Sequence, residues 1–316
     1  MFSTLLGPLP VDRDQTDAPD GDHDGASEGD AERQADLESS RRLDDVDALT
    51  GIGLELITDG GPPATPDDIP TAVVARWAAA AESTGATVKA VLTGPWTAAR
   101  ANGSAAEAEA ERLGELLTAL ATAGCPIIEI AETDALDIAT DPAAAREFAV
   151  AHRRLTEGLA GTHCSLALTG GNVDGVDPAI LFDLPYASYA FDLIAGPDNW
   201  RLITRAPADR GIVCGALELA QGADRTRELL VWAAHYAAAS NGRGLARVGL
   251  ANAPGNGSLD RAETLRRLTI VAEASRIAAV ESTEELVGLL DPRAIDPRSA
   301  AFGRFAPAKR RRAPGR

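Results

Sequence analysis

Histidine and cysteine are neighbours at one place in this chain, His163-Cys164. They belong to a short stretch, 162–169, in which residues 165–168 are small and apolar, and which is followed by the sequence Gly-Gly-Asn at 170–172. An apolar run of this length before a Gly-Gly-Asn sequence predicts a buried strand that ends in a turn. This strand is therefore the first place to look for a reactive centre.

Polar side chains follow the other apolar stretches in a similar way. The residues at these predicted strand ends are Asp59, Thr93, Glu132, Thr169 with Asn172, Asp192, Glu218 and Asn256. Carboxylates that converge on one site can act as general acid or base, or can hold a cation through oxygen. Taken singly, each carboxylate is better explained as a helix cap or an arginine partner. As a set, they define a candidate ligand-binding mouth.

The elements that must position these residues form a repeating pattern of apolar stretches and helical stretches. The predicted strands are 1–6, 54–58, 87–93, 126–132, 162–169, 186–193, 211–218 and 246–253. The predicted helices are 31–49, 69–83, 105–123, 143–159, 225–239 and 259–279. The spacing suits βα units, which need about 30 residues or more each.

Eight such units predict an α/β fold, the (β/α)8 or TIM barrel, in which the active site lies at the C-terminal ends of the strands. The strands are almost continuously apolar, as expected when both faces of a parallel sheet are covered. A doubly wound open sheet is the alternative. The glycine-rich motifs GxGxxG and GxxxxGK[ST] do not follow any predicted strand, so the usual nucleotide-binding signatures are missing.

Composition restricts the class of protein. The net charge of -17 argues against a general nucleic-acid or anionic-membrane partner, and the polar strand ends lead us to expect a small-molecule ligand. The three cysteines are far apart in apolar surroundings, which is typical of buried thiols in a reducing cytoplasm. Neither a transmembrane segment nor a secretory signal is predicted.

Four regions are expected along the chain. Residues 1–11 hold the first barrel strand, and 12–30 form a flexible acidic loop with too few apolar residues to order itself. Residues 31–285 complete the barrel. The last region, 286–316, is a largely disordered tail rich in proline and arginine, whose basic cluster at 309–312 suggests either nucleic-acid contact or pairing with the acidic loop.

Five motifs occur in order on the predicted strands. They are Leu-Gly-Pro-Leu-Pro at 6–10, Gly-Leu-Glu-Leu-Ile-Thr-Asp-Gly at 53–60, Val-Lys-Ala-Val-Leu-Thr-Gly-Pro-Trp-Thr at 88–97, Ile-Glu-Ile-Ala-Glu at 128–132 and Gly-Ala-Leu-Glu at 215–218. Together they resemble the catalytic barrel of the cobalamin-independent methionine synthase family, with G-S-x-P, G-L-D-V-x-T-D-G-E, V-K-x-x-x-x-G-P-x-T, I-Q-I-D-E-P and G-V-V-D in these places. The resemblance covers about residues 1–285.

The resemblance implies a methyl transfer that serves methionine biosynthesis in the cytoplasm. In that family, a zinc ion binds the homocysteine thiol as a thiolate, which takes a methyl group from 5-methyltetrahydrofolate. The family's zinc ligands are His-x-Cys on the fifth strand, Glu after the sixth strand and Cys after the eighth. Soft ligands in a tetrahedral array suit zinc.

The chain departs from the family at these metal positions. Alignment on the turn at 170–172 places Ala167 and Thr169 at the His-x-Cys positions, and Asn256 at the second cysteine position. Asp192 corresponds to the family's Glu. His163 and Cys164 are an alternative ligand pair, but adjacent residues of a strand point to opposite faces.

The substrate contacts also differ. Gly61 and Ala131 replace two acids that hold the amino-acid substrate in the family. The polar residues that remain predict two groups of site residues. The candidate catalytic residues are Glu132, Asp192 and Glu218, and the candidate substrate-binding residues are Asp59, Thr93, Trp96, Asn172 and Asn256.

Three hypotheses follow. The first is a divergent enzyme, of the methyl or alkyl transferase class, that binds a small ligand at the barrel mouth. The second is a non-catalytic barrel that binds a ligand or a partner. The third is a conventional zinc methyltransferase that uses His163 and Cys164. The first hypothesis is favoured because the residues at the family's zinc positions do not match zinc ligands.

Overall fold

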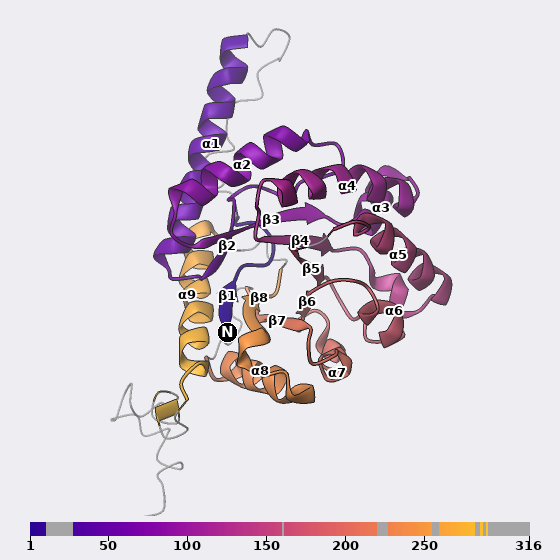
Figure 1. Ribbon diagram of the computed structural model, residues 1–316. Coiled ribbons are helices and arrows are strands. Elements are labelled where there is room, and N and C mark those ends of the chain that lie inside the picture. Colours follow the sequence, from indigo (N-terminus) through magenta and orange to yellow (C-terminus); the bar gives the residue numbers. More distant parts are fainter. Residues whose placement is uncertain are drawn as a thin grey trace, which may run out of the picture.

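The computed structural model describes residues 1–10, 28–159, 161–219, 227–254, 259–281, 285–286 and 289, with only the backbone of 28–32. Within these residues the chain forms a closed barrel of eight parallel strands in sequential order (Figure 1). The strands are β1 (Phe2–Thr4), β2 (Leu56–Thr58), β3 (Thr87–Thr93), β4 (Ile127–Glu132), β5 (His163–Leu168), β6 (Ser188–Asp192), β7 (Gly211–Leu217) and β8 (Val248–Asn252). The predicted (β/α)8 barrel is confirmed.

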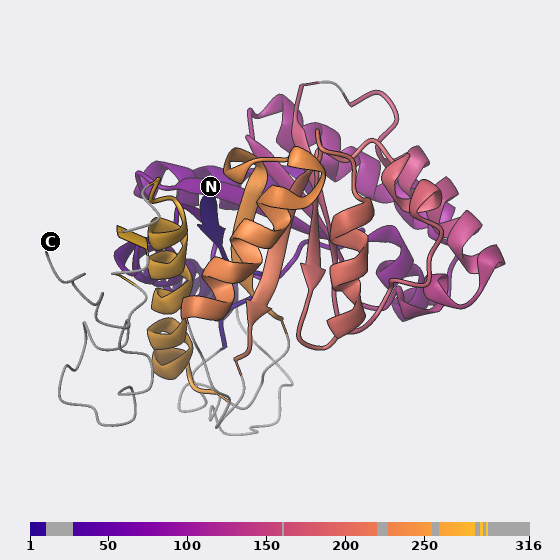
Figure 2. The ribbon, with the colours of Figure 1, turned by 90° about the horizontal axis from the view of Figure 1, so that it is seen from below.

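Helices follow the strands and surround the barrel. They are α1 (Glu28–Gly51), α2 (Pro70–Ser83), α3 (Pro95–Asn102), α4 (Ala106–Thr122), α5 (Pro142–Leu155), α6 (Pro178–Phe182), α7 (Trp200–Arg205), α8 (Arg227–Ala239) and α9 (Arg261–Ala278). Viewed from below, α8 and α9 lie side by side outside β8 and β1, which close the barrel (Figure 2).

The elements differ from the sequence-based prediction mainly at their ends. Helix α1 begins at Glu28, so the last three residues of the expected acidic loop are helical. Residues 12–27 of that loop lie outside the described residues, as does the expected tail at 286–316 apart from 286 and 289. The short helices α3, α6 and α7 were not predicted. They follow β3, β5 and β6, and α6 and α7 supply the helices that the prediction lacked after β5 and β6.

Strand periodicity divides the core into two parts. The apolar side chains that cluster inside the barrel are Leu6, Ala167, Ala190, Val213 and Ala251, with Phe2 packed against them. The outward-facing side chains pack against the surrounding helices in a much larger apolar cluster. Because alternate residues of a strand face opposite sides, the inward set on β5 includes Ala167 and excludes Cys164.

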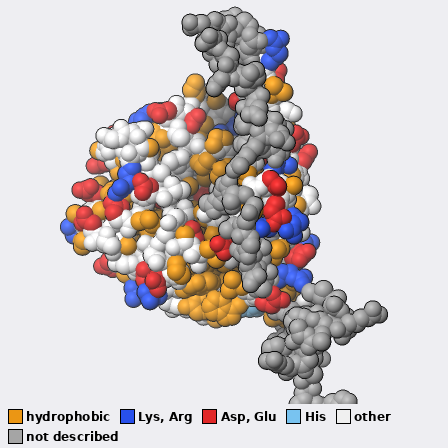
Figure 3. Space-filling model, turned by 180° about the vertical axis from the view of Figure 1, so that it is seen from behind, with side chains coloured by type: hydrophobic (Ala, Val, Ile, Leu, Met, Phe, Trp, Pro, Cys, Tyr) orange, Lys and Arg blue, Asp and Glu red, His pale blue; other side chains and the backbone are white. Residues whose placement is uncertain are grey.

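Hydrophobic side chains also gather on the surface. Figure 3 shows such a group at the lower end of the molecule, the end where Figure 1 places α7 and α8. Trp200 of α7 lies against Trp232 and Tyr236 of α8, with ring centroids 5.1 and 5.5 Å apart, and Trp232 is 52% exposed. No helix in the described part of the chain is both long enough and apolar enough to span a membrane.

Candidate active site at the barrel mouth

A cavity of about 380 Å³ opens at the C-terminal ends of the strands. Its wall combines residues of β3, β4, β5 and β8, the loops after most strands, and Thr264 of α9. The lining residues are Leu6, Gly7, Pro8, Leu9, Pro10, Pro63, Val91, Glu129, Ala131, Thr133, Ala167, Thr169, Leu219, Asn252, Pro254 and Thr264. Most of them are apolar, and a small number of polar groups among apolar walls is typical of a small-molecule site.

A buried ion pair lies at the base of this cavity. Lys89 Nζ of β3 is 2.6 Å from Glu129 Oε2 of β4 and donates a second hydrogen bond to the Leu5 carbonyl, at 2.8 Å. The two residues are 1% and 4% exposed. Glu129 Oε1 has no hydrogen-bonding partner among the described residues, although the side chain lines the cavity. The pair therefore leaves one carboxylate oxygen available to a ligand.

Asn252 fixes the cavity wall where the barrel closes. Its Oδ1 accepts a hydrogen bond from the Leu6 amide at 2.9 Å, and its Nδ2 donates to the Leu6 carbonyl at 2.8 Å. The side chain thus continues the pairing of β8 with the segment that follows β1. It holds the loop at 7–10 over one side of the cavity.

Glu132 ends β4 on its outward face. The carboxylate accepts hydrogen bonds from the Trp96 amide at 2.9 Å, the Thr97 amide at 2.7 Å and the Thr97 hydroxyl at 2.6 Å. The Trp96 and Thr97 amides belong to the first turn of α3, whose amides have no partner within the helix. A Cβ at Gly94 would come within 2.2 Å of the Glu132 carboxyl carbon, so only glycine fits at that position.

Glu132 also touches a buried histidine. His152 Nε2 of α5 lies 3.0 Å from Glu132 Oε1, in poor alignment for a hydrogen bond, and Nδ1 lies 2.6 Å from the Tyr186 hydroxyl. Burial, followed by the Glu132 charge, raises the pKa of Tyr186. All three side chains are fully buried outside the barrel, away from the cavity wall. These contacts make Glu132 a cap for α3, and a catalytic role for it stays a prediction.

Asp192 ends β6 and is likewise engaged by the backbone. Its carboxylate accepts hydrogen bonds from the amides of Gly170, Ile194 and Ala195, at 3.3, 3.0 and 2.9 Å. Asn172 is exposed and accepts a hydrogen bond from the Asp198 amide at 2.8 Å. Both side chains hold the loops after β5 and β6 together, and neither lines the cavity.

Two further predicted ligand-binding residues have structural partners. Asp59 accepts hydrogen bonds from Arg76 Nε at 2.7 Å and from the Gly61 amide at 3.0 Å. The Trp96 indole donates to Asp137 at 3.2 Å and lies under Arg100. Neither residue is part of the cavity wall.

The remaining predicted site residues are not part of the described cavity wall. Thr93 and Glu218 are half-buried near the ends of β3 and β7 and do not line the cavity. Asn256 lies outside the described residues. The structure therefore does not bring Glu132, Asp192 and Glu218 together at the mouth.

Ala167 and Thr169, the β5 residues that the sequence resemblance assigns to metal positions, are at the mouth, but they are not donors that suit zinc. Ala167 and Thr169 both line the cavity. Ala167 has no donor atom, and the nearby Asp192 carboxylate is occupied by three amides. Among the described residues, no three His, Cys, Asp or Glu side chains are grouped as a metal site. This donor set does not fit a zinc-bound thiolate.

The alternative ligand pair lies at the other end of β5. His163 Nε2 is 2.8 Å from the Ser188 hydroxyl, and Cys164 faces the helices on the opposite side of the strand. Burial raises the pKa of the Cys164 thiol to about 11, which disfavours the thiolate that zinc requires. His163 and Cys164 are therefore not placed to act together at the mouth.

Lys89 and Glu129 were not among the predicted site residues. The sequence contains two lysines and 28 arginines, and Lys89 is the lysine that falls inside an apolar strand. A lone lysine in a chain that otherwise uses arginine, with a glutamate on the next strand, is a signal that could have found the pair.

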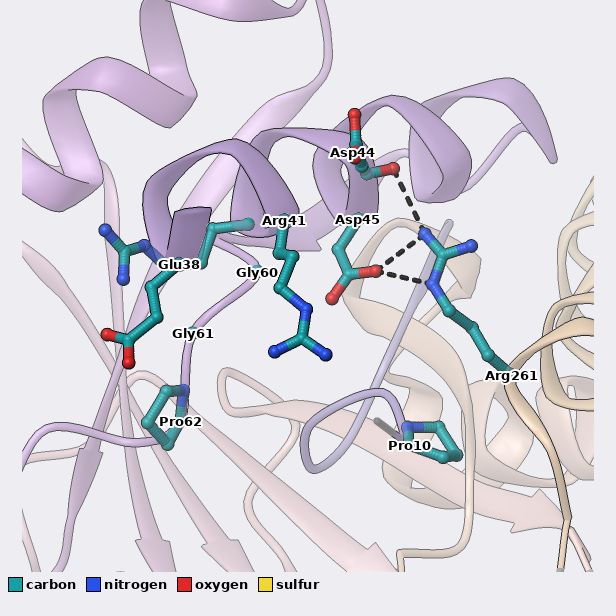
Figure 4. Close-up of a pocket in the computed structure, with 10 residues that line it drawn as sticks. Pro10, Glu38, Arg41, Asp44, Asp45, Gly60, Gly61, Pro62 and Arg261 are labelled. Carbon is teal, nitrogen blue, oxygen red and sulfur yellow. Dashed lines mark hydrogen bonds and ion pairs between the residues drawn. The ribbon is translucent and has the colours of Figure 1, made fainter. Parts of the chain in front are cut away.

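A second hollow of about 440 Å³ lies beside the mouth, between α1 and the loops after β1 and β2. Figure 4 shows Arg41 pointing between Pro10 and Pro62, and Arg261 paired with Asp45. Burial raises the pKa of Asp45, and Arg261 opposes that shift. Pro10 lines both this hollow and the mouth cavity, so the two are neighbours.

Solved structures share this fold over most of the chain. The B12-independent methionine synthase from Shewanella sp. W3-18-1, in complex with selenomethionine, is 14% identical with a TM-score of 0.67, and the match covers 87% of this chain and 96% of that one. A protein described as a vitamin-B12 independent methionine synthase, from Listeria monocytogenes, is 13% identical with a TM-score of 0.64, over 89% and 98%. A methyltransferase from Methanosarcina mazei is 14% identical with a TM-score of 0.52, over 87% and 94%.

At these identities the similarity shows the fold: the chain has the barrel architecture of methionine synthase-like methyltransferases. No protein-family model matches the sequence, and no curated protein matches it.

Proposed function

We propose that this chain binds a small organic ligand in the mouth cavity, without the zinc-bound thiolate of the methionine synthase family. The observation that carries the proposal is the base of the cavity, where the buried Glu129 has a carboxylate oxygen without a partner among the described residues. A cavity of about 380 Å³ is within the usual size range of ligand sites.

The same site limits the chemistry. Ala167 and Thr169 do not fit zinc, so we propose no step through a metal. Among the described residues, Glu129 is the carboxylate that lines the cavity, and it replaces Glu132 and Asp192 as the group that would exchange a proton with the ligand. The fold makes group transfer the first reaction class to test.

A blocked mouth provides the test of binding. Thr133 is exposed and lines the cavity, so a Thr133→Trp variant should fill the entrance while the fold is retained. Thr118→Trp, on the exposed face of α4, is the matched control. We expect fragments that raise the melting temperature of the native chain to lose this effect in Thr133→Trp and to keep it in Thr118→Trp. Fragments that act equally on all three proteins would refute the proposed site.

Metal analysis tests the other half of the proposal. After incubation with zinc and desalting, we expect less than one zinc per chain and no change in the Cys164→Ala variant. One zinc per chain that is lost in Cys164→Ala would restore the conventional zinc methyltransferase.

A further inference from the structure

A second polar group lies at the depth of Glu129 inside the barrel. Ser165 of β5 is the register partner of Glu129 on β4, and it is on the same face of its strand as Ala167 and Thr169. Ser165 is 4% exposed, and its hydroxyl has no hydrogen-bonding partner among the described residues. A buried hydroxyl without a partner is costly, so this position calls for a group that can bond to it.

Glu129 lines the cavity, and Ser165 lies beside it at the same level of the barrel, directly behind the described wall. Glu129 Oε1 can only accept a hydrogen bond, if the carboxylate is ionised, while the Ser165 hydroxyl can donate or accept. A hydroxyl or N–H group of a ligand would satisfy both atoms by donating to Glu129 and accepting from Ser165. Higher in the cavity, the Thr169 hydroxyl has no side-chain partner among the described residues and offers one more polar contact.

Charge decides which ligands fit. The Lys89–Glu129 pair carries no net charge, wherever its shared proton lies. Glu129 is also the one charged side chain in the described cavity wall. An anionic ligand would lose its hydration at this depth without a cation to pair with, and a cationic ligand would meet a carboxylate whose charge Lys89 already balances, so both are unfavourable. The amino and carboxylate groups of an amino acid would both face this cost.

We infer that the mouth cavity selects an uncharged, mainly apolar molecule whose hydroxyl or N–H group is bound between Glu129 Oε1 and the Ser165 hydroxyl. This inference rests on the proposed function and names its ligand class. This ligand class differs from the zwitterionic amino acid that the methionine synthase family binds. The sequence resemblance places Gly61 and Ala131 where that family has the two acids that hold its substrate.

The test uses probes that share one ring and differ in charge. Benzyl alcohol is uncharged with a donor, benzyl methyl ether is uncharged without one, benzylamine is a cation and benzoate is an anion. L-Homocysteine is added as the zwitterion. Ligand-observed NMR with the full chain measures the affinity of each probe. Comparison of the native chain with the Thr133→Trp variant identifies the probes that bind at the mouth.

Two serine variants separate the proposed contact from a general change in the barrel. Ser165→Ala removes the hydroxyl that lacks a partner. Ser188→Ala removes the neighbouring hydroxyl on β6, which is bonded to His163. We expect benzyl alcohol to bind most tightly, to weaken about fivefold in Ser165→Ala and to be unchanged in Ser188→Ala.

Each outcome decides a different claim. Tighter binding of benzoate, benzylamine or L-homocysteine at the mouth would overturn the inference and leave the proposed site standing. Equal binding of benzyl alcohol to the native chain and Ser165→Ala would also overturn it, since water alone would then occupy this position. If Thr133→Trp changes the binding of no probe, the proposed function itself fails.

Discussion

Replacement of Glu132 tests whether its carboxylate is a structural cap or a catalytic group. In Glu132→Ala, the amides of Trp96 and Thr97 and the Thr97 hydroxyl all lose their acceptor. A buried donor without a partner costs about 1–3 kcal/mol, and a lost helix cap costs about 1 kcal/mol. Some of these groups will find water, so we expect a loss of about 4 kcal/mol in the free energy of unfolding. This is a large part of the usual total of about 5–15 kcal/mol.

Urea denaturation followed by far-UV circular dichroism measures this loss. With a slope of about 3 kcal/mol per molar urea, the midpoint should fall by about 1.3 M. Glu132→Gln keeps a hydrogen-bond acceptor for the amides of α3, so its free energy of unfolding should fall by less than that of Glu132→Ala. Glu115→Ala, an exposed glutamate on α4, should change stability by less than about 0.5 kcal/mol. The reasoning is refuted if Glu132→Ala is as stable as the native chain, or if Glu132→Gln is stable but no longer binds mouth ligands.

Three further predictions concern stability. Gly94→Ala should cost about 2 kcal/mol or more in a melting experiment, because its Cβ would lie 2.2 Å from the Glu132 side chain. Gly114→Ala, inside α4 with open space around it, should instead add about 0.5–1 kcal/mol. Asn252→Ala should cost about 2–4 kcal/mol in urea denaturation, because two buried backbone groups lose their partner. Stability should also fall by about 1.4 kcal/mol per pH unit above pH 9 for each buried thiol that stays protonated in the fold. Burial raises the pKa of Cys214 from 9.0 to about 12, so only the unfolded chain releases that proton in this range, and urea titrations of Cys214→Ala should show a smaller pH slope. Equal pH slopes in the native chain and in Cys214→Ala would contradict the raised pKa of the Cys214 thiol.

The barrel could be predicted from the sequence because its signal is repeated. Each predicted strand is short, five of the eight are followed directly by glycine or a polar residue, and β3 has the predicted bounds of Thr87–Thr93. The short helices α6 and α7 escaped prediction because five or six residues carry too little periodicity to be recognised.

The site was harder to predict because the strands are apolar on both faces. Glu132 was correctly placed at the end of β4, but the sequence did not show that position 132 faces the helices while 129 and 131 face the cavity. A shift by one residue along a strand moves a side chain from one face to the other. On β5 the alternation of faces was predicted, and there Ala167 and Thr169 line the cavity while Cys164 does not.

The most direct test of the account is a crystal structure of the full chain soaked with benzyl alcohol. The account predicts the ligand hydroxyl about 3 Å from Glu129 Oε1 and from the Ser165 hydroxyl, with the ring against Ala167. Water alone between Glu129 and Ser165, or a metal ion at the mouth of β5, would contradict it.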